Sequence, residues 1–175
     1  MDQALIVIDM QNDFVTGALG TPEARAILPA VTAAIADPAY TLCYATLDTH
    51  GPDYADTLEG KKLPVPHCIR GTAGWQLDPA VAQALAGRQA TLLEKPTFGS
   101  LELARAIQRQ AGTLAGVTLC GVCTDICVAS NALLLRAFCP DLPIRVLAKA
   151  CAGVTPAAHA AALATMASCQ IDVVE

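Results

Sequence analysis

The sequence predicts an α/β fold in which a mostly parallel sheet is covered by helices on both faces. Short apolar runs alternate with helix patterns along the whole chain, and most of the runs are continuously apolar. Continuous apolar runs are typical of parallel strands that are buried on both faces. Alternating strands and helices favour a three-layer α/β/α architecture, in which ligands bind at the carboxyl ends of the strands.

The expected elements follow one another in regular alternation. The six expected strands are Ala4–Asp9, Tyr40–Thr46, Ala90–Glu94, Val117–Gly121, Ile144–Ala148 and Ile171–Val174. The expected helices are Glu23–Ala36, Pro79–Ala86, Leu101–Ala111, Asp125–Phe138 and Pro156–Ser168. Proline suits the first turn of a helix, so Pro79 and Pro156 mark two helix starts. Gly112 and Gly153 mark boundaries between elements.

Length and composition indicate a single globular domain spanning residues 1–175. With 54% hydrophobic and 15% charged residues, the chain buries much of its surface. The net charge of −5 leaves no basic surface for nucleic acid or for an anionic membrane. No apolar stretch is long enough for a membrane span, and the start of the chain lacks the basic region of a signal peptide.

Eight cysteines are spread along the chain, most of them inside strand or helix patterns, as at Cys43, Cys120 and Cys169. This distribution is typical of free, buried cysteines in a cytoplasmic protein. Three residues separate Cys123 from Cys127, so the pair is not a CxxC redox motif, and the other spacings do not suggest a zinc ribbon.

The segment Gly121–Val128 carries the strongest candidate nucleophile, Cys127. It lies where a strand ends and a helix begins, with Thr124 or Asp125 as the expected N-cap. The positive end of the helix dipole and free N–H groups there would favour a thiolate and could bind an oxyanion. Cys123 is expected to supply one of these N–H groups. The alternative is that Cys127 is a small buried helix residue.

Asp9 and Lys95 each end an expected strand at the same sheet edge. A partly desolvated Asp9 would have a raised pKa suited to proton transfer. Its alternative role is to cap a helix or bond a loop. Lys95 would be a cation beside Asp9 and Cys127, where it would fix the carboxylate and stabilise a thiolate. Its alternative is an ordinary solvated strand end.

The segment Leu47–Asp78 is the longest irregular stretch, and long loops in compact domains are usually functional. It contains two of the three histidines, His50 and His67. Asp48 and His50 are two residues apart, so in an extended segment their side chains leave on the same side. A mixed set of aspartate and histidine suits Zn, Mn or Fe. His159 is interpreted as an ordinary helix-face residue.

Asp9, Lys95 and Cys127 together resemble the isochorismatase-like cysteine hydrolases. The resemblance spans the chain and is most specific in the Asp-x-Gln-x-Asp-Phe opening at Asp9–Phe14 and in the motif Gly121–Val128. It implies a six-stranded parallel sheet in the order 3-2-1-4-5-6 and a homo-oligomer, either a dimer or a tetramer.

The resemblance also implies a mechanism. Asp9 takes the proton of Cys127, and the thiolate attacks an amide carbonyl. The backbone N–H groups of Cys123 and Cys127 bind the oxyanion. A cis peptide between Val122 and Cys123 is expected in this turn.

Within the family, Asp48–His50 and Pro66–Thr72 resemble the metal loop of nicotinamidases, which members that hydrolyse isochorismate typically lack. Tyr54 stands where many nicotinamidases have another histidine. Glu59 matches the spacing of a glutamate that other nicotinamidases use instead. The resemblance therefore implies a divalent metal, with zinc expected first and manganese or iron as alternatives, on the ligands Asp48, His50, Glu59 and His67.

The leading functional hypothesis is a nicotinamidase of NAD salvage, which converts nicotinamide and water to nicotinate and ammonia. A metal-independent cysteine amidase acting on a carbamoyl or ureido compound is the alternative, and isochorismatase-type hydrolysis rests on fold analogy alone. Non-catalytic and thiol-redox roles are disfavoured by the three candidate catalytic residues and by the cysteine spacing. Phe14 and Phe98 are expected to stack on a flat substrate ring, with Trp75 and Tyr54 as weaker candidates; core packing is the alternative for these aromatics.

Overall fold

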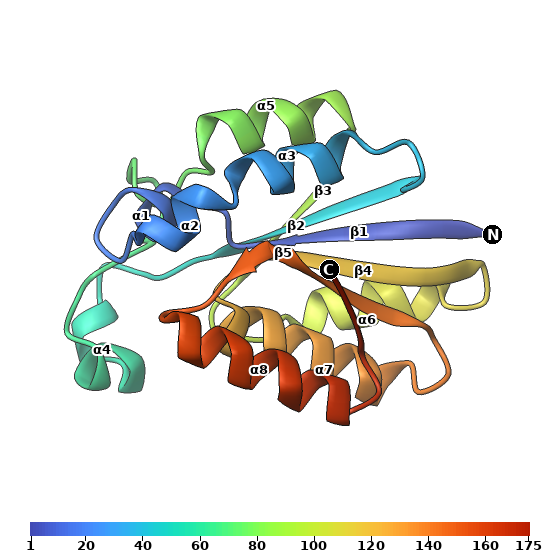
Figure 1. Ribbon diagram of the computed structural model, residues 1–175. Helices are drawn as coiled ribbons and strands as arrows, with labels where there is room; N and C mark the ends of the chain where they lie inside the picture. The colour runs from blue at the N-terminus through green and yellow to red at the C-terminus, as the bar shows by residue number, and fades with distance from the viewer.

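A computed structural model describes residues 1–175 and has a six-stranded, all-parallel sheet at its centre (Figure 1). The strand order β3-β2-β1-β4-β5-β6 is the one that the family resemblance implied. In β1, Ala4 lies between Leu42 of β2 and Val117 of β4. The strands are β1 (Asp2–Ile8), β2 (Leu42–Asp48), β3 (Thr91–Lys95), β4 (Leu114–Val122), β5 (Ile144–Ala152) and β6 (Asp172–Val174).

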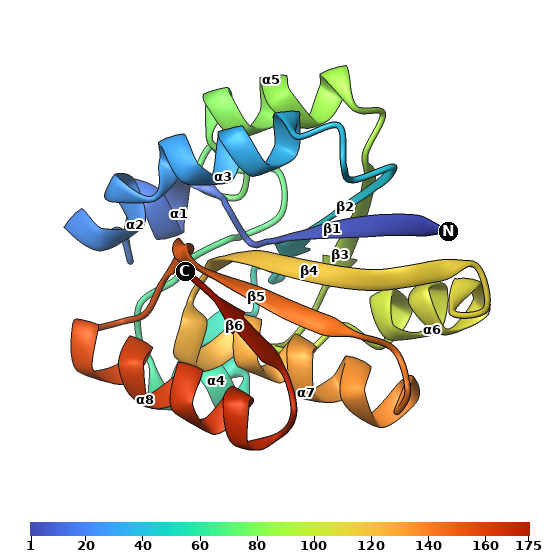
Figure 2. The ribbon, with the colours of Figure 1, turned by 45° about the vertical axis from the view of Figure 1, so that its right-hand side comes forward.

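Helices cover both faces of the sheet, which confirms the three-layer prediction (Figures 1 and 2). One face carries α2 (Pro22–Ala26), α3 (Leu28–Ala36) and α5 (Pro79–Gly87). The other carries α6 (Leu101–Gln110), α7 (Ala129–Phe138) and α8 (Pro156–Ser168). None of the helices combines the length and the apolar character that a membrane span requires.

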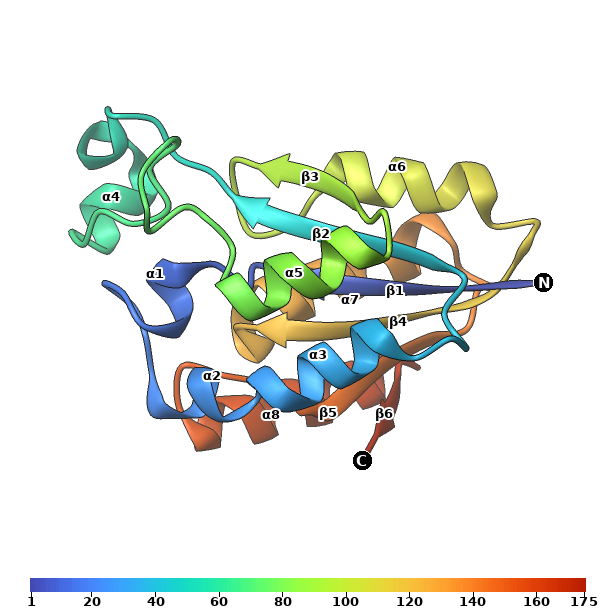
Figure 3. The ribbon, with the colours of Figure 1, turned by 90° about the horizontal axis from the view of Figure 1, so that it is seen from above.

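Three short elements gather at the end of the sheet where the parallel strands finish (Figure 3). They are α1 (Asn12–Val15), the 3-10 helix η1 (Tyr54–Asp56) and α4 (Leu58–Lys62). The last two lie inside Leu47–Asp78, so the segment expected to be irregular contains two helical turns. Thr57 caps α4 by accepting a hydrogen bond from the Gly60 N–H at 3.0 Å. Such brief turns leave no periodic pattern for sequence analysis to detect.

Two expected helices are each divided in the structure. The helix expected over Glu23–Ala36 breaks at Ile27, because Pro29 has no N–H to bond the carbonyl of Arg25. The helix expected over Asp125–Phe138 begins with a π-helical turn, η2 (Thr124–Val128), before α7 follows. In that turn the Val128 N–H donates to the Cys123 carbonyl five residues back, at 3.1 Å.

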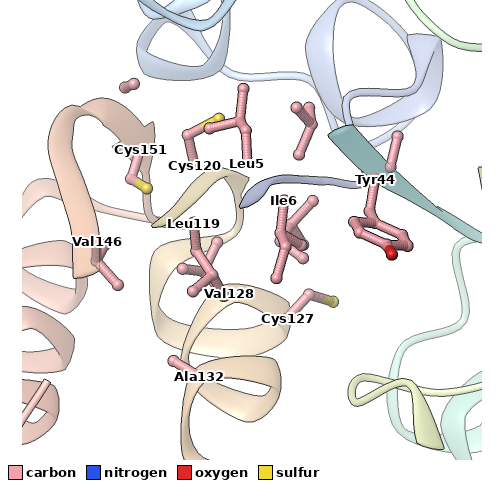
Figure 4. Close-up of a cluster of buried hydrophobic side chains, with 14 of the residues drawn as sticks. Leu5, Ile6, Tyr44, Leu119, Cys120, Cys127, Val128, Ala132, Val146 and Cys151 are labelled. Carbon is pink, nitrogen blue, oxygen red and sulfur yellow. The ribbon is translucent and has the colours of Figure 1, made fainter. Parts of the chain in front are cut away.

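The core fills the space between the sheet and its two helical layers. On the face of α7, Ile6 of β1 and Leu119 of β4 meet Val128, with Cys127 at the edge of this cluster (Figure 4). Gly121 has φ +117° and sits so close to β1 that an added Cβ would overlap the Ile8 carbonyl. Only glycine allows β4 to pass β1 in this way, next to the turn that carries Cys127.

Replacing Leu119 by alanine is expected to lower the free energy of unfolding by about 2–5 kcal/mol, because the side chain is fully buried at the centre of the sheet. Urea unfolding followed by circular dichroism measures this loss. Leu92→Ala on β3 is the matched control, since Leu92 is 52% exposed. Equal losses for the two variants would contradict the placement of the core.

Candidate active site

Four neighbouring strands end at one edge of the sheet and deliver the candidate catalytic groups there (Figure 3). Asp9 follows β1, Asp48 ends β2, Lys95 ends β3, and Cys127 lies in η2 directly after β4. The strand order reverses direction between β1 and β4, which is where open α/β sheets bind their ligands. Asp9 and Cys127 therefore stand on the two sides of this switch point.

Lys95 is the centre of the catalytic cluster and is 1% exposed. Its Nζ donates hydrogen bonds to Asp48 Oδ1 at 3.0 Å, to the Thr97 carbonyl at 3.0 Å and to Cys127 Sγ at 3.4 Å. The same Nζ lies 2.7 Å from Asp9 Oδ2. Lys95 is thus not the solvated strand end of the alternative interpretation; it joins both carboxylates to the thiol.

Asp9 is fully buried, and its two carboxylate oxygens have different surroundings. Thr46 Oγ1 donates to Asp9 Oδ1 at 2.6 Å. Oδ2 faces Lys95 but accepts no hydrogen bond of good geometry. The backbone of Asp9 has φ +50°, a conformation that non-glycine residues rarely adopt and that turns the chain out of β1. The buried carboxylate is therefore held by the Thr46 hydroxyl at one oxygen and by the Lys95 ammonium at the other.

The charges in the cluster set the protonation of its members. Burial raises the pKa of Asp9, although the charge of Lys95 opposes this. Burial alone would lower the pKa of Lys95, but Asp9, Cys127 and Asp48 outweigh it, so the net shift is upward and Lys95 stays an ammonium. Burial and the nearby Asp9 carboxylate raise the pKa of Cys127 well above its usual value.

Burial thus favours the thiol form of Cys127, whereas the helix start in the sequence favoured a thiolate. The reason is burial: the side chain is 6% exposed and lies against the core, and Lys95 compensates only in part. A base must take the proton when the sulfur reacts. Asp9, with its raised pKa, is closer in proton affinity to a thiol than an ordinary carboxylate would be.

The turn that carries Cys127 is built around the carbonyl of Cys123, which accepts the N–H groups of Ile126 at 3.0 Å and Val128 at 3.1 Å. The Val122–Cys123 peptide is cis, as expected. Neither Thr124 nor Asp125 is the N-cap; Cys123 takes that position and makes no side-chain cap. The assignment of the Cys123 and Cys127 N–H groups to an oxyanion remains a prediction.

Four side chains next to the cluster form a group that could hold a metal. The ligand atoms of Asp48, His50, Glu59 and His67 all lie within 4.8 Å of one another. Asp48 Oδ2 lies 2.9 Å from His50 Nε2 and 3.6 Å from His67 Nε2. Glu59 Oε1 lies 3.8 Å and 3.6 Å from the same two nitrogens.

This donor set fits a divalent cation of the zinc type, for which two imidazole nitrogens and two carboxylates are suitable ligands. Burial opposes the ionisation of Asp48, but hydrogen bonds with His50 and His67 and the charge of Lys95 outweigh it and lower its pKa. Asp48 is also shared, because Oδ1 accepts from Lys95 while Oδ2 faces the histidines. The metal group and the catalytic cluster thus meet at one carboxylate.

Two polar residues that hold the site in place, Gln11 and Asp13, were not identified from the sequence. Gln11 donates from Nε2 to the carbonyls of Asp48 and Trp75 at 2.8 Å, and its Oε1 accepts the Asp48 N–H at 2.7 Å. Asp13 Oδ2 accepts the N–H of Cys68, the residue after His67, at 2.8 Å. Gln11 and Asp13 both lie in the Asp9–Phe14 motif, which is the feature of the sequence that could have identified them.

Asn131, on α7, holds the nucleophile turn and was also missed. Its Nδ2 donates to the Cys127 carbonyl at 2.8 Å and to the Phe98 carbonyl at 3.0 Å, and its Oδ1 accepts the Ser100 N–H. Asn131 is 1% exposed. The apolar helix pattern around it gave no sign of this role.

The aromatic residues divide into two kinds. Phe14 is buried with its ring 5.5 Å from His67, and Tyr54 packs edge-on against His50 at 4.9 Å and His67 at 5.1 Å. Phe14 and Tyr54 therefore pack against the two histidines that could bind the metal. Phe98 is 43% exposed, and Trp75 is half-buried with its Nε1 donating to Thr49 Oγ1 at 2.9 Å. Substrate stacking by Phe14, Phe98 or Trp75 remains a prediction.

Comparisons with known proteins agree with this geometry. The isochorismatase domain family matches residues 3–175. The chain is 27% identical to the nicotinamidase/pyrazinamidase of Mycobacterium tuberculosis, with 98% of each chain covered. It is similar to the nicotinamidase/pyrazinamidase structure from Bacillus subtilis, with 27% identity, complete coverage of both chains and a TM-score of 0.83. The pyrazinamidase of Pyrococcus horikoshii in complex with zinc is also 27% identical, with 100% and 99% coverage and a TM-score of 0.79.

Proposed function

Because the chain belongs to the isochorismatase family of hydrolases, we propose that it is a metal-dependent nicotinamidase whose nucleophile is Cys127. One observation carries this proposal: Asp48 joins the Asp9–Lys95–Cys127 cluster to a group of two histidines and a second carboxylate. The first cluster suits attack on a carbonyl, and the second suits a metal that orients the substrate. The likeness to nicotinamidases supports the choice of substrate, which would place the enzyme in NAD salvage.

The proposed reaction has two stages. In the first, Asp9 accepts the Sγ proton and Cys127 attacks the amide carbonyl, while backbone N–H groups of the turn stabilise the oxyanion. The C–N bond then breaks, and Asp9 returns the proton to the leaving ammonia, which leaves a thioester on Cys127. In the second stage Asp9 takes a proton from water, and the hydroxide attacks the thioester. The acid leaves, and the proton returns to the sulfur.

Lys95 has two tasks in this proposal. Its charge opposes the rise that burial causes in the pKa of Asp9 and so favours the ionised carboxylate that acts as the base. Its hydrogen bond to Sγ, 3.4 Å in the resting site, becomes stronger when the sulfur carries negative charge. Lys95 thus stabilises the charge as it moves from the carboxylate to the thiolate.

Asp48, His50, Glu59 and His67 would hold the metal, with zinc supported by the zinc-bound pyrazinamidase to which the chain is similar. A bound metal supplies a fixed positive charge that can orient a polar atom of the substrate. The packing of Tyr54 and Phe14 against the histidines keeps their imidazole rings in place. Gln11 fixes the main chain of Asp48 from the other side.

The function is tested by ammonia release from nicotinamide by the purified protein, before and after treatment with a chelator. We expect release that falls on chelation and returns with added zinc. Carbamoyl and ureido compounds should be much poorer substrates. Hydrolysis of a ureido compound at a rate that chelation leaves unchanged would contradict the nicotinamidase proposal and support the metal-independent amidase.

Replacing His67 by alanine is expected to weaken zinc binding at least about 10-fold, because it removes one of two buried imidazole ligands. Zinc content after dialysis and isothermal titration measure the effect without using activity. His159→Ala is the matched control for zinc content, because His159 lies on α8 and is not in the metal group. Full zinc content in His67→Ala would remove His67 from the proposed ligand set.

A further inference from the structure

Two polar side chains of the nucleophile turn form hydrogen bonds with α8 and with the segment that leads from β5 into it. Thr124 Oγ1 and His159 Nδ1 share a hydrogen bond of 2.8 Å. Asp125 Oδ1 accepts the Val154 N–H at 2.9 Å. These are the two side chains that the sequence suggested as caps of their own helix. In the structure Thr124 instead contacts α8, and Asp125 contacts the loop before α8.

The contact is tightly packed as well as polar. Thr124 is fully buried, and His159 is half-buried at the start of α8. Gly153 lies between Asp125 and His159, and an added Cβ there would come within 2.8 Å of Asp125 Oδ1 and of the His159 backbone nitrogen. The absence of a side chain at Gly153 thus lets the two segments touch.

The hydrogen bonding within η2 explains why contacts from Thr124 and Asp125 to other segments matter for its conformation. In η2 the Cys123 carbonyl accepts both the Ile126 and the Val128 N–H, so the first turn is wider than that of an α-helix. Thr124 follows Cys123, and Cys127 lies three residues further on. Because Thr124 lies between Cys123 and Cys127 in this turn, its position affects the direction of the backbone N–H groups of both cysteines.

From this geometry we infer that His159 is a positioning residue: through Thr124 it holds the N–H groups of the nucleophile turn in the orientation that an oxyanion requires. The inference rests on the proposed function, because the oxyanion is that of the proposed amide hydrolysis. Asp125 and Val154 form the second attachment of the same turn. His159 does not touch the reacting atoms and acts only through Thr124.

The test uses paired variants of the two partners. Thr124→Val and His159→Ala each remove the hydrogen bond, whereas Thr124→Ser and His159→Asn retain groups that can form it. Removal should lower kcat for nicotinamide about 10-fold and leave KM within about twofold, because an oxyanion forms only after the substrate is bound. The double variant Thr124→Val/His159→Ala should be no worse than either single change.

A second measurement is independent of the substrate. Alkylation of Cys127 by iodoacetamide, mapped by peptide mass spectrometry, should be about 10-fold slower in the two removal variants, because misaligned N–H groups stabilise the thiolate less. Thr165→Val is the matched control, since the Thr165 hydroxyl bonds only the Ala161 carbonyl of α8. It should alkylate at the wild-type rate.

Removal variants that alkylate as fast as the wild type would overturn the inference, even if their melting temperature falls, because the contact would then be structural only. A failure of Thr124→Ser and His159→Asn to restore the rate would overturn it too. If the wild-type protein released no ammonia from nicotinamide, the proposed function would fail, and the alkylation rates would still decide the role of His159.

Discussion

Replacing Cys127 by alanine is expected to reduce kcat/KM for nicotinamide by at least about 10⁴-fold, because no thioester can then form. The sulfur lies 3.4 Å from Lys95 Nζ in a buried site. Steady-state ammonia release measures the loss. Trapping of a thioester on the wild-type enzyme, seen as a mass increase on the peptide that contains Cys127, tests the same step directly.

The control for this change is Cys169→Ala, because Cys169 is an exposed free thiol far along the chain from the site. It should hydrolyse nicotinamide at the wild-type rate. Circular dichroism should show that Cys127→Ala is folded, since the change removes one small side chain. If folded Cys127→Ala kept more than about one hundredth of the wild-type rate, covalent catalysis by this thiol would be wrong.

Replacing Asp9 by asparagine is expected to lower kcat/KM by about 10²–10⁴-fold, the usual contribution of a general base. Asparagine matches the shape of the carboxylate and can still accept the hydrogen bond from Thr46, but it cannot take the proton of Cys127. It also leaves Lys95 with one counter-charge fewer in a buried site, so some loss of stability is expected. Rates should be measured well below the melting temperature of the variant.

The pH dependence of kcat/KM provides a second test of Asp9 as the general base. The base must be ionised, and burial raises its pKa, so the wild-type kcat/KM should fall as the pH is lowered through that raised value. Asp9→Asn should lack this acidic limb, whereas the exposed surface control Asp141→Asn should keep it. An unchanged acidic limb in Asp9→Asn would assign the titration to another group.

The sequence was sufficient to predict the sheet and the residues gathered at its edge. Continuous apolar runs predicted the positions of the strands. The ends of those strands indicated Asp9 and Lys95 as candidate site residues. The strand order and the metal ligands came from the resemblance to a known family. Asp48, His50, Glu59 and His67 do come together in space. Their roles in metal binding and catalysis remain predictions for the experiments above.

Features that depend on the third dimension were not predictable. The thiol form of Cys127 follows from burial on the fold, whereas the sequence indicated only a helix start. The π-helical turn η2 has the same apolar pattern as an α-helix, so its wider hydrogen bonding could not be predicted from the sequence. His159 was assigned to a helix face because its partner, Thr124, is distant in the chain.

The position of β1 also affects how the site is assembled during folding. β1 is hydrogen-bonded to β2, its neighbour in the chain, and to β4, where Asp2 pairs with Leu114 across a long stretch of sequence. Closing such a long loop costs entropy before the contacts form, so the junction of β1 and β4 is expected to be a slow step. Asp9 and Cys127 lie on opposite sides of this junction. The reactive thiol therefore meets its base only when the two halves of the sheet join, and a chain in which β1 and β4 have not yet paired has no competent nucleophile.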